Sequence, residues 1–163
     1  MMRAIPFMVL LALTSGPLAG EELVTFRVLA PDTAVALAQG VLADCRERGF
    51  QVAVAVVDRM GVPQAMIRDR YAGPHTPDTA VRKAWTAVSF REDTLALSEN
   101  TGSGSPQAGA RQIANALMLG GGVPIEVAGS IVGGVGVSGA PGGADDHACA
   151  LAGIETVQAD LEF

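Results

Sequence analysis

The chain has 163 residues, of which 49% are hydrophobic and only 4% aromatic, and its formal net charge is -6. This length suits one domain with one hydrophobic core. The negative charge, and the lack of any Lys/Arg cluster interleaved with aromatic residues, argue against a nucleic-acid partner.

The first 20 residues have the pattern of a signal peptide. Arg3 supplies positive charge, Phe7 to Leu13 form a short apolar core, and small residues follow up to Gly20. The apolar run is too short to span a bilayer as a structural helix. We therefore expect export to the periplasm or the medium, which leaves a single mature domain over residues 21–163 with no membrane span.

Two cysteines, Cys45 and Cys149, lie far apart in the chain. An oxidising compartment would allow them to pair, and closing a loop of about 100 residues contributes about 4 to 5 kcal/mol in the chain-entropy model. The alternative is a pair of buried thiols.

Hydrophobic periodicity and turn residues predict the order of the elements. Hairpin strands with segregated helices indicate an antiparallel sheet in an α+β domain. The predicted helices cover residues 31–48, 79–90, 92–97 and 144–161, and the predicted strands cover residues 52–57, 62–69, 116–119, 122–127 and 130–138.

The stretch from Tyr71 to Asp78 is the strongest candidate for a ligand site. It places His75 directly before a helix, with Thr76 as the expected N-cap and Pro77 at the first helical position. Four cations flank it: Arg68, Arg70, Arg82 and Lys83. We expect the two on the helix, Arg82 and Lys83, to face solvent or an anionic ligand.

Other motifs favour structural roles. Residues 134–139 match the dinucleotide-binding pattern, but no room remains for the second parallel strand that this site requires. Ser89 and Ser138 have no histidine at a hydrolase spacing, and Asp145 with Asp146 are expected to cap the last helix. The absence of CxxCH excludes covalent c-type haem. A zinc site has weak support from spacing, and its ligands would be Cys45, His75, His147 and Cys149.

Several short segments, in order along most of the mature chain, resemble the GlcG/HbpS-like haem-binding family, also described as a haem-degrading domain. They are residues 53–58 with Gly61, residues 83–87, 121–125 and 134–140, Asp145 with Asp146, and residues 152–154. The resemblance implies a profilin-like α-β-α sandwich with a five-stranded antiparallel sheet. It also implies ring-like homo-oligomers and non-covalent haem binding.

Relatives in this family store haem, assist haem sensors or degrade haem, and some use a histidine in the N-terminal segment as the axial ligand. Residues 21–58 contain no histidine here, so His75 and His147 are the two candidates. We expect His75 to bind the iron, because it precedes a helix at an exposed position, and Arg70, Arg82 and Lys83 to hold the propionates. The alternatives are a scaffold for another small ligand or partner protein, and a haem-degrading enzyme.

Overall fold

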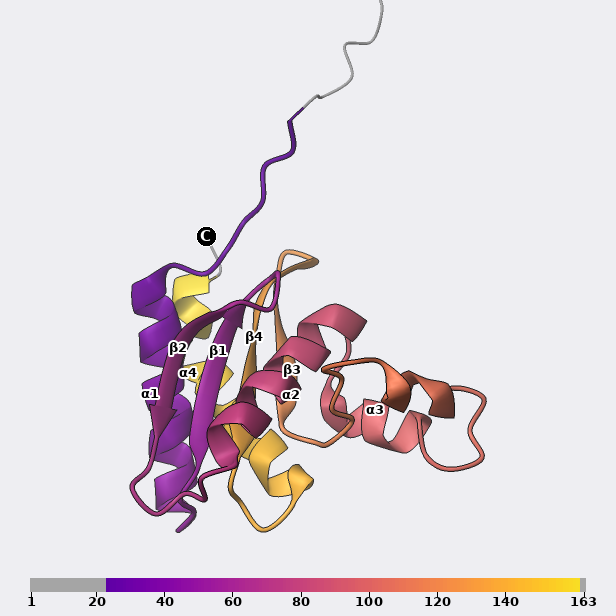
Figure 1. Cartoon of the computed structure of the whole chain (residues 1–163). Helices are drawn as coiled ribbons and strands as arrows, with labels where there is room; N and C mark the ends of the chain where they lie inside the picture. The colour runs from indigo at the N-terminus through magenta and orange to yellow at the C-terminus, as the bar shows by residue number, and fades with distance from the viewer. Residues whose placement is uncertain (1–22, 162–163) are drawn as a thin grey trace, which may run out of the picture.

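The structure is a computed structural model that describes residues 23–161 (Figure 1). The predicted signal peptide over residues 1–20 lies outside the described residues. In chain order the elements are α1 (Pro31–Glu47), β1 (Ala53–Asp58), β2 (Pro63–Arg68), α2 (Thr76–Phe90), α3 (Thr94–Asn100), the 3-10 helix η1 (Ala108–Gln112), β3 (Gly122–Val127), β4 (Ser130–Ser138) and α4 (Gly143–Leu161).

Within residues 23–161 the strands form one four-stranded sheet in the order β2-β1-β4-β3. Every neighbouring pair is antiparallel. This confirms the α+β class with an antiparallel sheet, whereas the prediction of a fifth strand is wrong. The segment predicted as that strand, residues 116–119, forms no strand and contacts α2 and α3.

Side chains from α2 and from the start of α3 explain why residues 116–119 form no strand. The Leu117 N–H donates to the Thr86 hydroxyl at 2.9 Å, and the Leu119 carbonyl accepts from the Thr94 hydroxyl at 2.7 Å. Backbone groups that side chains satisfy in this way have no need of a neighbouring strand. Ala116 and Met118 are buried beside Leu97 of α3, whereas Leu119 is exposed, so the apolar pattern of this segment reflects packing against helices and not a strand.

The helices cover the two faces of the sheet as separate layers. Helices α1 and α4 pack together on one face, and α2 packs across β1, β4 and β3 on the other (Figure 1). In β1, Val54 and Val56 belong to the larger core with α1 and α4, whereas Ala53 and Ala55 pack against Ala80 of α2. The small side chains on the α2 face let that helix lie close to the sheet.

A disulfide between Cys45 and Cys149 joins α1 to α4, with 5.4 Å between the two Cα atoms. Both residues are fully buried in the core between these helices. The predicted pairing is confirmed, and the alternative of two buried thiols is wrong.

Two helix starts differ from the sequence prediction. Helix α2 begins at Thr76 with His75 as its N-cap residue, and the Thr76 hydroxyl donates to the Gly73 carbonyl at 2.8 Å instead of capping an N–H. Helix α3 begins at Thr94, because the Asp93 carboxylate accepts from the Ala96 N–H at 2.8 Å as an N-cap. Among the described residues, no helix combines the length and the apolar character needed to cross a membrane.

Candidate functional site

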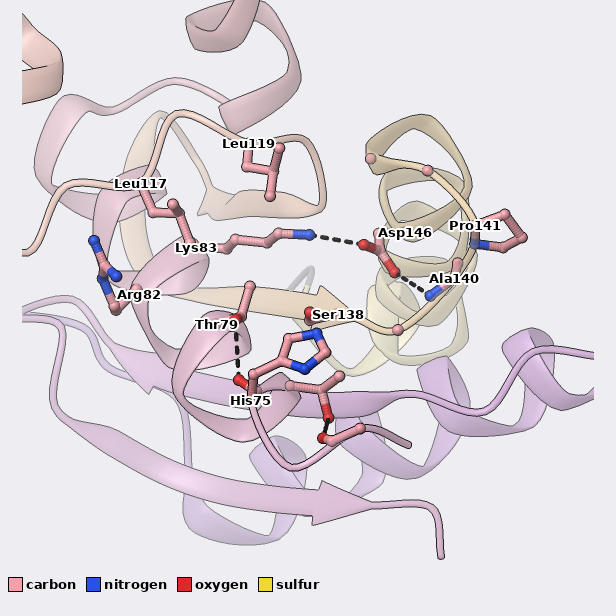
Figure 2. Close-up of a pocket in the computed structure, with 15 residues that line it drawn as sticks. His75, Thr79, Arg82, Lys83, Leu117, Leu119, Ser138, Ala140, Pro141 and Asp146 are labelled. Carbon is pink, nitrogen blue, oxygen red and sulfur yellow. Dashed lines mark hydrogen bonds and ion pairs between the residues drawn. The ribbon is translucent and has the colours of Figure 1, made fainter. Parts of the chain in front are cut away.

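A pocket of about 470 Å³ opens where the first turns of α2 meet the loop that leads into β3 and the loop from β4 to α4 (Figure 2). It brings together three of the four residues predicted for the haem site, His75, Arg82 and Lys83. Its volume lies in the range of small-ligand sites, about 300 to 1,000 Å³.

His75 stands at the edge of this pocket and is exposed to solvent. Its ring lies against Gly73, where an added Cβ atom would be 2.7 Å from the ring Cε1 and 2.9 Å from Nδ1. Within the part of the chain that the structure describes, neither ring nitrogen makes a hydrogen bond. The imidazole therefore has a nitrogen free to bind a ligand that enters the pocket.

Arg82 is half-buried on the next turn of α2, and its guanidinium donates to the carbonyls of Asn115 and Ala116 at 3.4 and 3.2 Å. These bonds involve Nε and Nη2, so further N–H donors remain on the guanidinium. The apolar side chains of Leu117 and Leu119 line the same pocket (Figure 2). The site thus combines an imidazole, an apolar wall and a cation.

Lys83 is buried, whereas the sequence had predicted that it faces solvent or an anionic ligand. Its side chain is only 1% exposed, and its Nζ lies 2.7 Å from Asp146 Oδ2 and 2.9 Å from the Val137 carbonyl. Asp146 in turn accepts from the Ala140 N–H at 3.0 Å through Oδ1. The carboxylate therefore joins α2 to the β4–α4 loop, a wider role than the helix capping expected for it.

Burial acts on both members of this ion pair. Loss of solvent lowers the pKa of Lys83, and the attraction and hydrogen bond of Asp146 oppose that change. Loss of solvent also raises the pKa of Asp146, against the charge and hydrogen bond of Lys83 and the Ala140 N–H. Ionisable groups whose pKa values are displaced in this way are concentrated at functional sites, although structural pairs show the same effect.

The structure places the remaining candidates outside the pocket. Arg70 is exposed, and its guanidinium carbon lies 5.8 Å from the centre of the Tyr71 ring. His147 is half-buried on α4, with an Nδ1 atom that has no partner among the described residues. The zinc hypothesis loses Cys45 and Cys149 to the disulfide, and residues 23–161 contain no cluster of metal-ligating side chains.

Sequence reasoning did not select the residues that complete the pocket from other segments. They are Leu117, Leu119, Ser138, Ala140, Pro141 and Asp146. The sequence analysis placed Ser138 and Asp146 in segments that resemble the family, but it gave neither residue a role in ligand binding. The available signal was the Gly-rich break over residues 139–143, which predicts a turn but not what the turn faces.

The family model for the haem-degrading protein HbpS-like group matches residues 29–155. No protein of curated function matches the chain. Among solved structures, the chain is 34% identical to a double mutant of Streptomyces reticuli HbpS, with a TM-score of 0.79 and coverage of 96% of this chain and 99% of that one.

A second HbpS crystal structure is 35% identical, with a TM-score of 0.79 and coverage of 85% of this chain and 96% of that one. A PduOC protein solved in complex with haem is 25% identical, with a TM-score of 0.73 and coverage of 78% of this chain and 94% of that one. By its match to the family model and to these structures, the chain belongs to the HbpS-like family of haem-degrading proteins.

Proposed function

We propose that this protein is an exported haem-binding protein that holds haem non-covalently in the pocket at the start of α2, with His75 as an axial ligand to iron. The observation that carries the proposal is the His75 ring, which stands at the pocket edge without a hydrogen bond inside the described domain. Neutral imidazole is a common ligand of haem iron.

The other pocket residues fit the chemistry of haem. The porphyrin needs apolar contacts, which Leu117, Leu119 and Pro141 offer, and its propionates need cations. Arg82 is the best placed cation, because it lines the pocket and retains free N–H groups. Lys83 would contribute from the inner end, and Arg70 would act only from outside the pocket.

Titration of haemin into the purified mature protein tests the axial ligand. We expect a Soret band shifted from that of free haemin, and we expect His75→Ala to lose or change this shift. His147→Ala is the matched control, because His147 does not line the pocket. An unchanged Soret band in His75→Ala would contradict the ligand assignment, and no band shift in the wild type would contradict haem binding itself.

Export and assembly are parts of the same proposal. The N-terminal pattern supports removal of residues 1–20, and the resemblance of the sequence segments to the family implies a homo-oligomer. Mass measurement of the protein secreted or recovered from the periplasm should give a chain that starts near residue 21, and light scattering should give a mass of several chains.

Haem degradation is the second candidate function, and the description of the matching family favours it. Incubation of the haem complex with a reductant and oxygen would test it by product analysis. Loss of porphyrin faster than from free haem, with release of a linear tetrapyrrole, would establish turnover. Equal rates would leave binding as the function.

A further inference from the structure

Ser138 presents a hydroxyl without a partner to the pocket. The residue ends β4, is only 5% exposed and lines the pocket beside Lys83 and Asp146 (Figure 2). Within residues 23–161 its Oγ atom makes no hydrogen bond. The hydroxyl opens onto the pocket, so it can donate a hydrogen bond to an acceptor atom of a bound ligand.

Lys83 offers a second donor at the same place. Its ammonium group carries three N–H bonds, and the contacts to Val137 and Asp146 account for two of them. Both Asp146 oxygens are already engaged, Oδ2 by Lys83 and Oδ1 by the Ala140 N–H. The inner end of the pocket therefore has an unused N–H donor on Lys83, whereas both oxygens of the Asp146 carboxylate already accept hydrogen bonds.

The start of α4 adds to this surplus of donors. Gly142 and Gly143 line the pocket, and α4 is a 19-residue helix that begins at Gly143. The N–H groups of Asp145 and Asp146 already donate to the Gly142 carbonyl at 3.1 Å, which leaves those of Gly143 and Ala144 at the helix start, where the helix dipole places a partial positive charge. A negatively charged group bound beside Ser138 would face this helix start.

We propose that the inner end of the pocket is a carboxylate-binding subsite, in which Ser138 Oγ and Lys83 Nζ donate to one ligand carboxylate. The carboxylate is either a propionate of haem or that of a small free acid, since both present the same group. The subsite lies in the pocket proposed for haem, but it requires no iron and no contribution from His75.

Titration of propionate into the haem-free protein, followed by amide chemical shifts, tests the subsite. We expect saturable shifts at Ser138, Ala140 and Gly143. Ser138→Ala should weaken binding about tenfold or more, because it removes a hydrogen bond to a charged group. Ser130→Ala is the matched control, because Ser130 is the exposed first residue of the same strand. Propionamide, the neutral isostere, should bind far more weakly than propionate.

The outcomes separate the subsite from haem binding. No saturable shifts with propionate, or equal affinity in Ser138→Ala and the wild type, would overturn the subsite. His75→Ala should bind propionate with the affinity of the wild type. Propionate binding therefore tests the subsite even if haemin gives no Soret shift. If haem supplies the carboxylate, the dimethyl ester of haemin should bind wild type more weakly than haemin, and Ser138→Ala should reduce that difference. Equal affinities of the ester and haemin for the wild type would assign the subsite to a free acid.

Discussion

Lys83 of α2 and Asp146 of α4 form an ion pair with 2.7 Å between Nζ and Oδ2, although their side chains are only 1% and 5% exposed. Removing one member of a buried pair leaves an uncompensated charge, which typically costs about 3 to 5 kcal/mol. The pair also fixes the β4–α4 loop, because Asp146 accepts from the Ala140 N–H. Its loss should therefore affect both the stability of the fold and the shape of the pocket.

Lys83→Met should lower the free energy of unfolding by about 3 kcal/mol at pH 7, and by less at pH 5. The charge and hydrogen bond of Lys83 hold down the pKa of Asp146, so their loss raises that pKa further above 3.8. Between 3.8 and the raised value the folded variant binds more protons than the unfolded chain, so its stability falls as the pH rises through this window. Urea unfolding at the two pH values measures the change.

Two variants control this experiment. The double variant Lys83→Met/Asp146→Asn removes both charges, so it should be more stable than Lys83→Met. The difference between its free energy of unfolding and that of the wild type should not grow between pH 5 and pH 7. Arg48→Met breaks the exposed pair with Asp44, where Arg48 is 44% exposed, and should have a small effect that is equal at both pH values. If the loss of unfolding free energy in Lys83→Met became smaller as the pH rises, an unpaired Asp146 carboxylate could not be its cause.

The elements predicted correctly are those whose signals are local. Helix α1 begins at Pro31 and ends just before Gly49, and β1 and β2 form the predicted hairpin around Gly61. Caps, turn residues and periodicity act within a few positions, so a single sequence reveals them. The sequence also predicted that His75 and Arg82 lie near each other, because His75 is the N-cap residue of α2 and Arg82 lies on the second turn of that helix.

The features that were missed depend on contacts between distant segments. Lys83 can be buried because its ammonium group pairs with the Asp146 carboxylate. That partner lies 63 positions further along the chain, beyond the reach of a local pattern. Residues 116–119 stay out of the sheet because Thr86, 31 positions before Leu117, binds its backbone N–H. The local sequence around Lys83 shows only a charged residue on a helix, and residues 116–119 show only a short apolar run. Neither pattern reveals the distant partner.

The disulfide should contribute strongly to stability, because it joins residues 104 positions apart. In the chain-entropy model a loop of about 100 residues contributes about 4.7 kcal/mol by restricting the unfolded chain. Cys45→Ala/Cys149→Ala should therefore unfold at a much lower urea concentration than the oxidised wild type. Thiol titration of the denatured, unreduced wild type should find no free cysteine, and two free thiols would contradict the pairing.

Gly136→Ala should separate α2 from the sheet. A Cβ atom at Gly136 would clash with the Ala80 carbonyl oxygen and would lie 2.8 Å from the Ala84 backbone nitrogen. Because both contacts are to helix backbone, α2 itself must shift, and overpacking of this kind costs about 1 to 3 kcal/mol or more. Gly109→Ala is the control, since no atom lies within 4 Å of its added Cβ. Equal unfolding midpoints of the two variants would contradict the close packing.

Gly73→Ala should disturb haem binding without destabilising the fold. The added Cβ would occupy space taken by the His75 ring, 2.7 Å from Cε1 and 2.9 Å from Nδ1, so the imidazole must swing away. Gly73 has no positive φ angle, so alanine brings no backbone strain of that kind. If His75 binds the iron, the displaced ring should shift the Soret band and weaken haem binding about tenfold, on the order of 1.4 kcal/mol.

Gly142→Ala provides the matched control, because Gly142 lines the same pocket and its added Cβ would meet only Asp145 Oδ2 at 3.6 Å, an ordinary contact. This variant should keep the wild-type Soret band. Thermal unfolding of haem-free Gly73→Ala should match that of the wild type, because the exposed His75 ring has room to move toward solvent. A wild-type Soret band and affinity in Gly73→Ala would show that the position of the imidazole does not matter to haem, and would therefore argue against His75 as the ligand.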